Sequence, residues 1–513
     1  MKKKLFNIHK LIGINVILFF FLSLFFGILT IFKPYINLWE DQKKHISHIK
    51  IEDINLEKCL KQVTKRKYFG EDGKIIRNDI IKLSFPAMEM KANNLIRIDN
   101  RSNFYLDPQT CKKIKPKAFT ISHFFEKIHT GAIFNSIVFK ILFGFMSVAV
   151  VFLSLSGLFM IIKNKYRNSV KSTKSHYAKY HRLLLLYTLP LVLMFGLTGA
   201  LFNLGVYSSP LITSHLTNGD TANILAVDRN ILVDPDLEAP KPTQKTNNIP
   251  LNELYKKAKN EFKDISFYSM QVYNYKDINA KVKFIGFEPN NYFISSVTNE
   301  SYIVLDANNG QILDKKTADE GTFTEKTLDA IFYLHYLRTF EDIPRILFAF
   351  ISMSMLVGLV YAMTLWLKRT QADKFSYKVL KPLSLSIMLG SLIAASMLFA
   401  SNWIIPKGYF SFVLFDKFLF TQEVLFYLVY LAVFIYIIIK KDTLIIIKNS
   451  FYLSSFLLFI AVLAHTINSE FNIFNTYEKA MYEIFFTDIA LTITAVSLFF
   501  FAKKIPKEYI DFN

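Results

Sequence analysis

Cysteine and acidic residues are scarce in this sequence, and the glycine motifs of nucleotide-binding proteins are missing. Two Cys among 513 residues exclude a disulfide-dense scaffold and any cysteine-rich zinc or iron–sulfur framework. No Gly-x-Gly-x-x-Gly follows an expected strand and no P-loop is present, so nothing indicates a nucleotide-binding domain. The sequence also shows no nucleophile–base pair that would indicate a hydrolase. The 41 Asp and Glu are outnumbered by 61 Lys and Arg, which leaves a net charge of +20.

Hydrophobic residues are abundant instead, and they are gathered into long runs. They make up 52% of the sequence, with 51 Phe and 26 Tyr. Runs of about 20 uncharged residues are typical of membrane-spanning helices, so the sequence predicts a polytopic α-helical membrane protein in a lipid bilayer. We expect eight spans, at 11–32, 141–162, 183–202, 346–367, 383–403, 418–439, 451–467 and 484–501. The alternative is six or seven spans with one interfacial helix, because 451–467 is short and 418–439 contains Glu423.

The positive charge lies on alternate connections between these spans. The two terminal segments and the connections at 163–182, 368–381 and 440–448 together hold 22 basic and four acidic residues. The rest of the chain is nearly neutral, with 39 basic and 37 acidic residues. Lys and Arg gather on the cytoplasmic side of membrane proteins. We therefore expect both termini in the cytoplasm, and the charge gives no support to a nucleic-acid partner.

Two long connections are then expected outside the membrane, each forming a small α+β module. Both hold strand-like segments that end in turn signals, as at 104–109 and 302–311. Cys59 and Cys111 lie in the first connection and could either form a disulfide in an oxidising compartment or stay free thiols. The expected order along the chain is a first span in 1–33, a module at 34–140, two spans at 141–206, a second module at 207–345, a fourth span at 346–368 and four C-terminal spans at 380–503.

Four of the ten histidines stand at matching corners of an internal repeat. His9 and His181 each lie two residues before a span that leads outward, and His129 and His335 lie shortly before spans that lead inward. Imidazole is a common ligand of haem iron, and two His from different helices could hold one haem from opposite faces. The repeat predicts two haems, one on His9 and His181 at the inner side and one on His129 and His335 at the outer side. Such iron has no free coordination site, which favours electron transfer.

Each of these histidines also has a simpler interpretation, as an interfacial anchor of its helix. His176 competes with His181 as a ligand, and His123 competes with His129. The later residue of each pair matches its counterpart in the repeat. Three basic residues that stand beside candidate ligands are candidate partners of haem propionates, namely Lys10, Arg182 and Arg338.

Short motifs around these histidines resemble those of a known family. They are Ile8-His9-Lys10-Leu11-Ile12-Gly13, His181-Arg182, Lys127-Ile128-His129 and Tyr333-Leu334-His335-Tyr336, and the ends of the two modules at 105–110 and 305–313 are similar too. In order and topology they resemble the PepSY-associated transmembrane family, also called iron-regulated membrane proteins, over roughly residues 5–370.

The resemblance implies a b-type dihaem protein of the inner membrane of Gram-negative bacteria, with the four histidines as axial ligands. It implies two PepSY-like periplasmic modules and an oxidoreductase that reduces ferric siderophores. The electron donor would be a cytoplasmic flavin or NAD(P)H reductase, or a membrane quinol, because the chain has no nucleotide site of its own.

The four C-terminal spans go beyond the four-span core of that family. They carry Glu423, His465 and Asp488, all expected near the outer side. Polar residues in membrane spans are costly and are candidates for function. These three could form a proton-handling, quinol or metal-entry site, or they could only reach water or pair with each other.

The leading hypothesis is thus a transmembrane dihaem electron-transfer protein that serves iron acquisition. One alternative is a haem-free binding or regulatory membrane protein whose outside modules bind a partner. Another is a transporter that uses the polar groups of the C-terminal spans.

Overall fold

The computed structural model describes residues 2–63, 68–69, 75–76, 80–85, 94–98, 104–115, 117–133, 136–163, 172–205, 214–215, 218–219, 243–295, 298–337, 342–405, 411–414, 417–440 and 442–505. The chain forms two compact units. The helical unit comprises Met1–Glu40, Ala118–Ser208 and Ile343–Asn513, and the sheet unit comprises Asp41–Lys117 and Ser209–Asp342.

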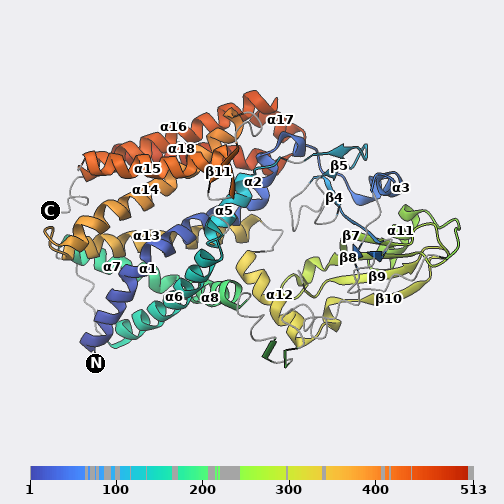
Figure 1. Ribbon diagram of the computed structural model, residues 1–513, viewed down its shortest axis with the longest axis horizontal. Coiled ribbons are helices and arrows are strands. Elements are labelled where there is room, and N and C mark those ends of the chain that lie inside the picture. Colours follow the sequence, from blue (N-terminus) through green and yellow to red (C-terminus); the bar gives the residue numbers. More distant parts are fainter. Residues whose placement is uncertain are drawn as a thin grey trace. The chain divides into compact units, whose positions relative to one another are not determined.

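Seven helices within the described ranges are long and apolar enough to cross a membrane (Figure 1). They are α1 (Lys2–Ile31), α6 (Ile137–Lys163), α13 (Asp342–Arg369), α14 (Phe375–Ile404), α15 (Thr421–Lys440), α16 (Thr443–Ser469) and α18 (Tyr482–Lys504). Each covers the centre of an expected span. The protein is therefore a multi-pass membrane protein.

The remaining expected span, 183–202, is broken. Its residues are divided between α7 (Thr173–Tyr187) and α8 (Leu189–Ala200), which meet at a bend of 68° and continue into a π-helical turn at Leu201–Gly205. Pro190 stands in the first turn of α8 and has no N–H to donate to the preceding turn, so the helical hydrogen-bond ladder is interrupted there. The structure thus has seven candidate spans, or eight if this bent pair counts as one.

Two further span boundaries differ from expectation. The short span expected at 451–467 is part of α16, which has 27 residues. Its serines stay helical because their hydroxyl groups bond within the helix, as Ser450 does to the carbonyl of Ile446. Phe418 lies outside α15, in a hairpin of β11 (Ser411–Leu414) and β12 (Lys417–Phe420).

Short helices complete the helical unit. They are α2 (Lys33–Trp39), α5 (Ile121–His129) and α17 (Ile473–Glu478). Helix α5 runs against α1 and α2. The apolar core of the unit brings together side chains of α1, α6 and α13, such as Phe21, Phe143 and Met355.

The sheet unit contains one antiparallel sheet of eight strands, in the order β10-β9-β8-β7-β3-β4-β5-β6. The strands are β3 (Ile80–Ser84), β4 (Ile96–Ile98), β5 (Tyr105–Leu106), β6 (Lys113–Ile114), β7 (Ser266–Tyr273), β8 (Lys281–Phe287), β9 (Ser301–Asp306) and β10 (Ile312–Lys316). A separate hairpin joins β1 (Tyr68–Phe69) to β2 (Ile75–Ile76).

The two long connections share this sheet, although the sequence predicts a module for each. Strands β3 to β6 come from the first connection and β7 to β10 from the second. They are joined at the centre, where β3 pairs with β7 over Ile80–Ser84. Helix α3 (Leu56–Leu60) precedes the first set of strands and α11 (Leu251–Glu261) precedes the second, and both contribute to one apolar core.

The last turn of each set has the same hydrogen bonds. Asp107 accepts from the N–H groups of Gln109 and Thr110, and Asp306 accepts from those of Asn308 and Asn309. The residue four positions after each Asp has a left-handed backbone: Cys111 (φ 57°) in one turn and Gly310 (φ 70°) in the other. The strand–turn–strand endings predicted at 104–109 and 302–311 are therefore present, and they are structural repeats of each other.

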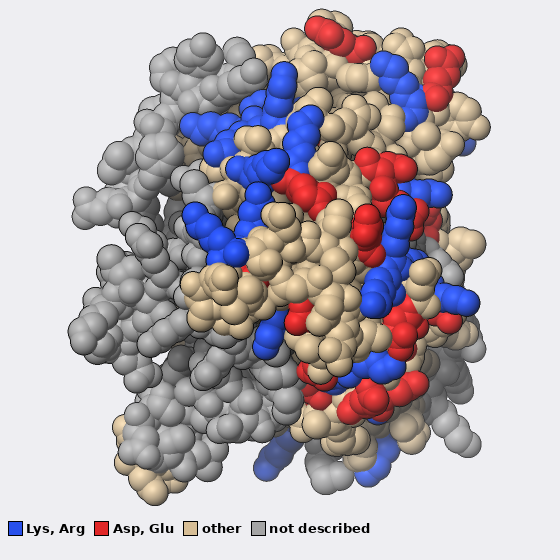
Figure 2. Space-filling view, turned by 90° about the vertical axis from the view of Figure 1, so that its right-hand side faces the viewer, with Lys and Arg blue, Asp and Glu red and all other residues tan. Residues whose placement is uncertain are grey.

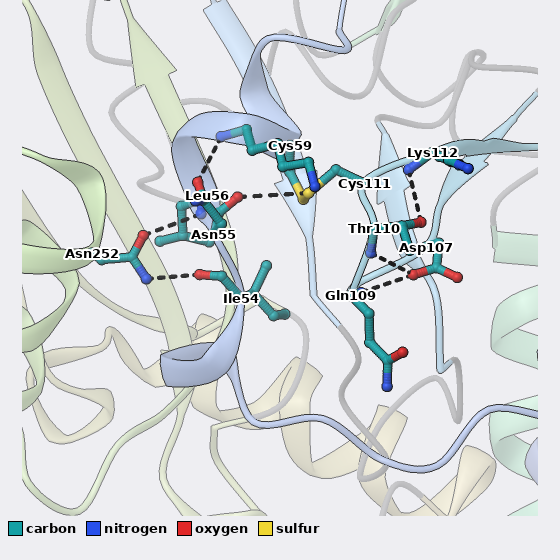
Figure 3. Close-up of a disulfide and its surroundings, with 11 residues drawn as sticks. Ile54, Asn55, Leu56, Cys59, Asp107, Gln109, Thr110, Cys111, Lys112 and Asn252 are labelled. Carbon is teal, nitrogen blue, oxygen red and sulfur yellow. Dashed lines mark hydrogen bonds between the residues drawn. A yellow bond between two sulfur atoms is a disulfide. The ribbon is translucent and has the colours of Figure 1, made fainter.

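Cys59 and Cys111 form a disulfide (Figure 3). It ties α3 to the turn between β5 and β6, and both cysteines are buried. Nearby, Asn252 of α11 accepts from the N–H of Leu56 and donates to the carbonyl of Ile54, which fixes the two halves of the unit to each other.

Charges of both signs are interspersed over the described residues of the face shown in Figure 2. Since neither sign covers this face, the +20 net charge is not displayed here as one basic surface. This matches the near-neutral balance that the sequence assigns to the long connections.

Candidate functional site

His9 lies near the start of α1 and contacts α6. Its Nδ1 is 2.8 Å from Oγ of Ser156. The Ser156 hydroxyl donates in turn to the carbonyl of Leu153. Because that serine has a single hydrogen, Nδ1 of His9 is the donor in this contact. Gly157 leaves room beside the ring, since a Cβ there would lie 3.5 Å from Cε1 of His9.

His181 lies in α7 and is held in the same manner by another helix. Its Nδ1 donates to the carbonyl of Gly358 in α13, at 3.3 Å. His9 and His181 are near enough to act on each other electrostatically, and Arg182 and Arg369 both act on His181. The structure thus places these two residues within electrostatic reach of each other, while their role as a ligand pair stays a prediction.

His129 ends α5 and packs against α1. Its Nδ1 donates to the carbonyl of Ser23 at 2.8 Å, while the Ser23 hydroxyl donates to the carbonyl of His129 at 2.9 Å. This double contact fixes both the ring and the end of the helix on α1.

All three rings thus use Nδ1–H to bond another helix, which leaves the lone pair on Nε2 in the neutral imidazole. A ring oriented in this way by a carbonyl or hydroxyl is the usual arrangement of a histidine that binds a metal through Nε2. The donor set therefore suits haem iron. Within the described residues, Nε2 of His9 and of His181 makes no hydrogen bond that would compete with a ligand.

The competing histidines have other surroundings. His123 is exposed and lies 3.0 Å from the carboxylate of Glu126, on α5 itself. His176 packs against the rings of Tyr180 and Tyr361. The later residue of each pair, in contrast, donates to a backbone carbonyl of another helix, which favours it as the ligand.

Two of the three candidate propionate partners lie in the described part of the chain. Lys10 is exposed and Arg182 lies beside His181. Arg338 falls outside the described residues. Arg369, at the end of α13, acts on His181 as well and was missed in the sequence because it is distant along the chain from every candidate ligand.

His335 belongs to the sheet unit, whereas His129 belongs to the helical unit. The outer pair therefore stays a prediction. The repeat is still visible locally, because each histidine lies two residues before a left-handed residue, Gly131 or Leu337, that turns the chain away from the helix.

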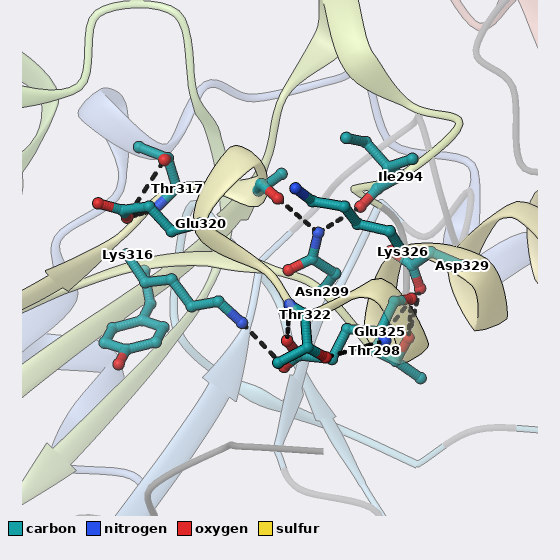
Figure 4. Close-up of polar contacts among 12 residues, drawn as sticks. Ile294, Thr298, Asn299, Lys316, Thr317, Glu320, Thr322, Glu325, Lys326 and Asp329 are labelled. Atoms are coloured by element: carbon teal, nitrogen blue, oxygen red, sulfur yellow. Dashed lines mark hydrogen bonds and ion pairs between the residues drawn. The ribbon is translucent and has the colours of Figure 1, made fainter. Parts of the chain in front are cut away.

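Helix α12 (Phe323–Tyr336), which carries His335, is anchored to the sheet by its first two turns (Figure 4). Thr322 and Glu325 form a reciprocal cap, and Glu325 is 2.9 Å from the ammonium of Lys316 in β10. Asp329 is fully buried and accepts from the backbone N–H and the hydroxyl of Thr298.

We predict that Asp329→Ala destabilises the sheet unit by about 1–3 kcal/mol, because it leaves the partly buried N–H of Thr298 without this acceptor. Asp319→Ala is the matched control, since Asp319 is exposed and lies four residues before the helix that Asp329 anchors. Thermal unfolding of the full chain in detergent measures the difference. Equal melting temperatures for the two variants would contradict the anchoring role.

We also predict that Gly27→Ala displaces His129. A Cβ at Gly27 would lie 2.9 Å from Nδ1 of His129 and 3.0 Å from its Cε1, closer than real contacts allow. Overpacking of this kind costs about 1–3 kcal/mol. Gly13→Ala makes the same change in the same helix, but its Cβ would be 3.8 Å from Leu153, an ordinary contact. Melting temperatures that fall equally in both variants would contradict this close packing.

The three polar residues of the C-terminal spans make different contacts. His465 and Asp488 are both fully buried, with Nδ1 and Oδ2 2.9 Å apart. Glu423 accepts from the N–H of Phe420 and is 3.9 Å from the ammonium of Lys127 in α5.

The fold defines a multi-pass membrane protein with a separate antiparallel sheet unit assembled from two long connections. Comparison with protein families identifies it further, since the profile of the PepSY-associated TM region matches residues 6–369. The chain belongs to this family, as its histidine motifs suggested. No curated protein gives a significant match.

Proposed function

We propose that the protein is a transmembrane b-type dihaem electron-transfer protein that reduces a ferric siderophore outside the bacterial inner membrane. The observation that carries the proposal is the orientation of His9, His181 and His129, each bonded through Nδ1 to a different helix. A haem with two axial His supplies one-electron transfer and has no open position for oxygen chemistry.

The roles of this chain's own residues follow from their contacts. His9 and His181 would hold the inner haem, with Ser156 and the carbonyl of Gly358 keeping both Nε2 atoms available. Arg182 and Arg369 would favour the propionates by charge. His129 would hold the outer haem with His335 as its partner, an assignment that rests on the repeat and on the family.

The direction of electron flow is proposed from topology. The basic connections favour a cytoplasmic location for both termini. A disulfide between Cys59 and Cys111 favours an oxidising compartment for the sheet unit. The sheet unit would then be periplasmic and would hold the siderophore, and the donor would be a cytoplasmic reductase or a membrane quinol.

A transporter is less well supported. Glu423 is engaged with Lys127, and Asp488 with His465 and the indole of Trp39, so these polar groups join helices to one another. A colourless purified protein would instead support the alternative of a haem-free binding or regulatory protein.

The proposed activity can be tested by mixing dithionite-reduced protein, freed of excess reductant, with a ferric trihydroxamate in a stopped-flow spectrometer. We expect the haem bands to return to their oxidised positions while Fe(II) is trapped by a chelator in equal electron equivalents. The gallium(III) trihydroxamate is the control, because Ga(III) has the same charge and nearly the same size but accepts no electron. Haem that stays reduced with the ferric complex would contradict the proposed substrate.

A further inference from the structure

The four C-terminal spans α14, α15, α16 and α18 lie beyond the matched family region, which ends at residue 369. We infer that they are a support for α5, which positions His129 and thereby sets the redox potential of the outer haem. This inference rests on the proposed function. Its evidence is a set of contacts, all inside the helical unit, that hold α5 at its start and along its length.

The start of α5 is capped by a residue that the C-terminal spans hold in place. The carboxylate of Glu40 accepts from the N–H of Ser122 at 2.9 Å and from its hydroxyl at 2.6 Å. A carboxylate at this end of a helix is favoured by the exposed N–H groups. The carbonyl of Glu40 accepts in turn from the side chain of Asn402, near the end of α14. Both Glu40 and Asn402 are buried.

The neighbour of Glu40 is held by the buried pair of α16 and α18. The indole N–H of Trp39 donates to Asp488 at 2.8 Å, while the other carboxylate oxygen of Asp488 faces His465. The rings of Trp39 and Trp403 lie 5.2 Å and 4.9 Å from the ring of His465. A buried carboxyl group between two such neighbours resists displacement, because moving it leaves buried polar groups without partners. Trp39 is thus fixed, and Glu40 with it.

The middle of α5 is packed between α1 and the C-terminal spans. The ring of Phe124 lies 5.0 Å from that of Phe426 in α15, and the ring of Phe125 lies 5.6 Å from that of Phe399 in α14. Phe26 of α1 contacts both Phe125 and Phe426, at 5.6 Å and 5.7 Å.

Charged contacts add to this packing. Lys127 faces Glu423 of α15 at 3.9 Å, and Glu126 is 2.7 Å from Lys33 at the start of α2. Burial alone would raise the pKa of Glu126, but the hydrogen bond from His123 and the nearby charge of Lys33 lower it to about 2. Glu126 therefore stays ionised at physiological pH and keeps this link.

His129 follows Phe125 by four residues, so the two side chains share one face of α5. If a smaller side chain replaced Phe426 or Phe399, α5 would shift into the vacated space. That shift would move the imidazole of His129 relative to Ser23 and Gly27. The orientation of an axial imidazole is one of the properties through which a protein tunes its haem. The C-terminal spans can thus influence the outer haem without binding a cofactor or substrate themselves.

The test compares the midpoint potentials and low-spin electron paramagnetic resonance signals of the two haems in wild type, Phe426→Ala and Phe456→Ala. Phe426 is buried against α5, whereas Phe456 of α16 is largely exposed on the bundle surface. We expect Phe426→Ala to move the potential and signal of one haem and to leave the other unchanged. Phe456→Ala should change neither. If Phe426→Ala does not accumulate, the same potentials and signals are measured in Asp488→Asn, which keeps the size of the side chain.

Two haems with unchanged potentials and signals in Phe426→Ala and Asp488→Asn would overturn this inference and leave the proposed function intact. Equal shifts of both haems would also overturn it, because they would indicate a general loosening. A wild-type protein without haem would instead contradict the proposed function and the inference with it.

Discussion

Replacing His181 by Ala should reduce the haem content of the purified protein from two per chain to one. We propose the imidazole of His181 as the ligand from α7, because its Nδ1 already donates to the carbonyl of Gly358 and leaves Nε2 for iron. A haem with two axial His loses one of its two bonds to the protein when one His is replaced by Ala. We therefore expect loss of the inner haem and not only weaker binding. His9→Ala should give the same result, because both residues belong to the same proposed pair.

The control is His176→Ala. His176 lies five residues before His181 in the same helix, but its ring packs on Tyr180 and Tyr361. This variant should keep both haems. Haem content is measured by the pyridine haemochrome assay per mole of protein. If His181→Ala and His9→Ala each retained two low-spin haems, the inner pair would be assigned wrongly.

The double variant Cys59→Ser/Cys111→Ser should lower the free energy of unfolding of the sheet unit by about 4 kcal/mol. The disulfide closes a separation of 52 residues along the chain, and closing a loop of this length removes much of the conformational freedom of the unfolded segment. It also fixes the turn at Cys111, whose left-handed backbone is occupied by glycine in the equivalent turn at Gly310.

This prediction is checked by limited proteolysis and thermal unfolding with and without a thiol reductant. The wild-type sheet unit should become protease-sensitive on reduction, while the double variant should be sensitive in both conditions and unaffected by the reductant. Haem at His9 and His181 should be retained, because both residues lie in the other unit. A double variant as resistant as the oxidised wild type would show that the bond contributes little.

Much of the membrane part could be predicted from sequence because a span is a local property. Apolar runs located seven helices, and the four histidines at the corners led to the family. The break at Thr188–Leu189 was missed, because hydrophobicity stays high across Pro190 and only the lost N–H reveals it.

Contacts between distant segments were beyond reach of the sequence. The pairing of β3 with β7 joins residues almost two hundred positions apart, so the single sheet could not be distinguished from two. The position of Trp39 against Asp488, and of Gly27 against His129, likewise depends on how helices pack. The signal that could have pointed to Trp39 is its own rarity, as one of three Trp in the chain, placed just after a span.

The central claim is that this chain holds two haems, and the most direct measurement is the spectrum of the purified protein. Protein from haem-sufficient cells, purified in mild detergent, should show the absorption bands of low-spin b-type haem when oxidised and when reduced with dithionite. The haemochrome assay should give about two haems per chain. A colourless protein from such cells would contradict the electron-transfer account and leave the histidines as anchors of their helices.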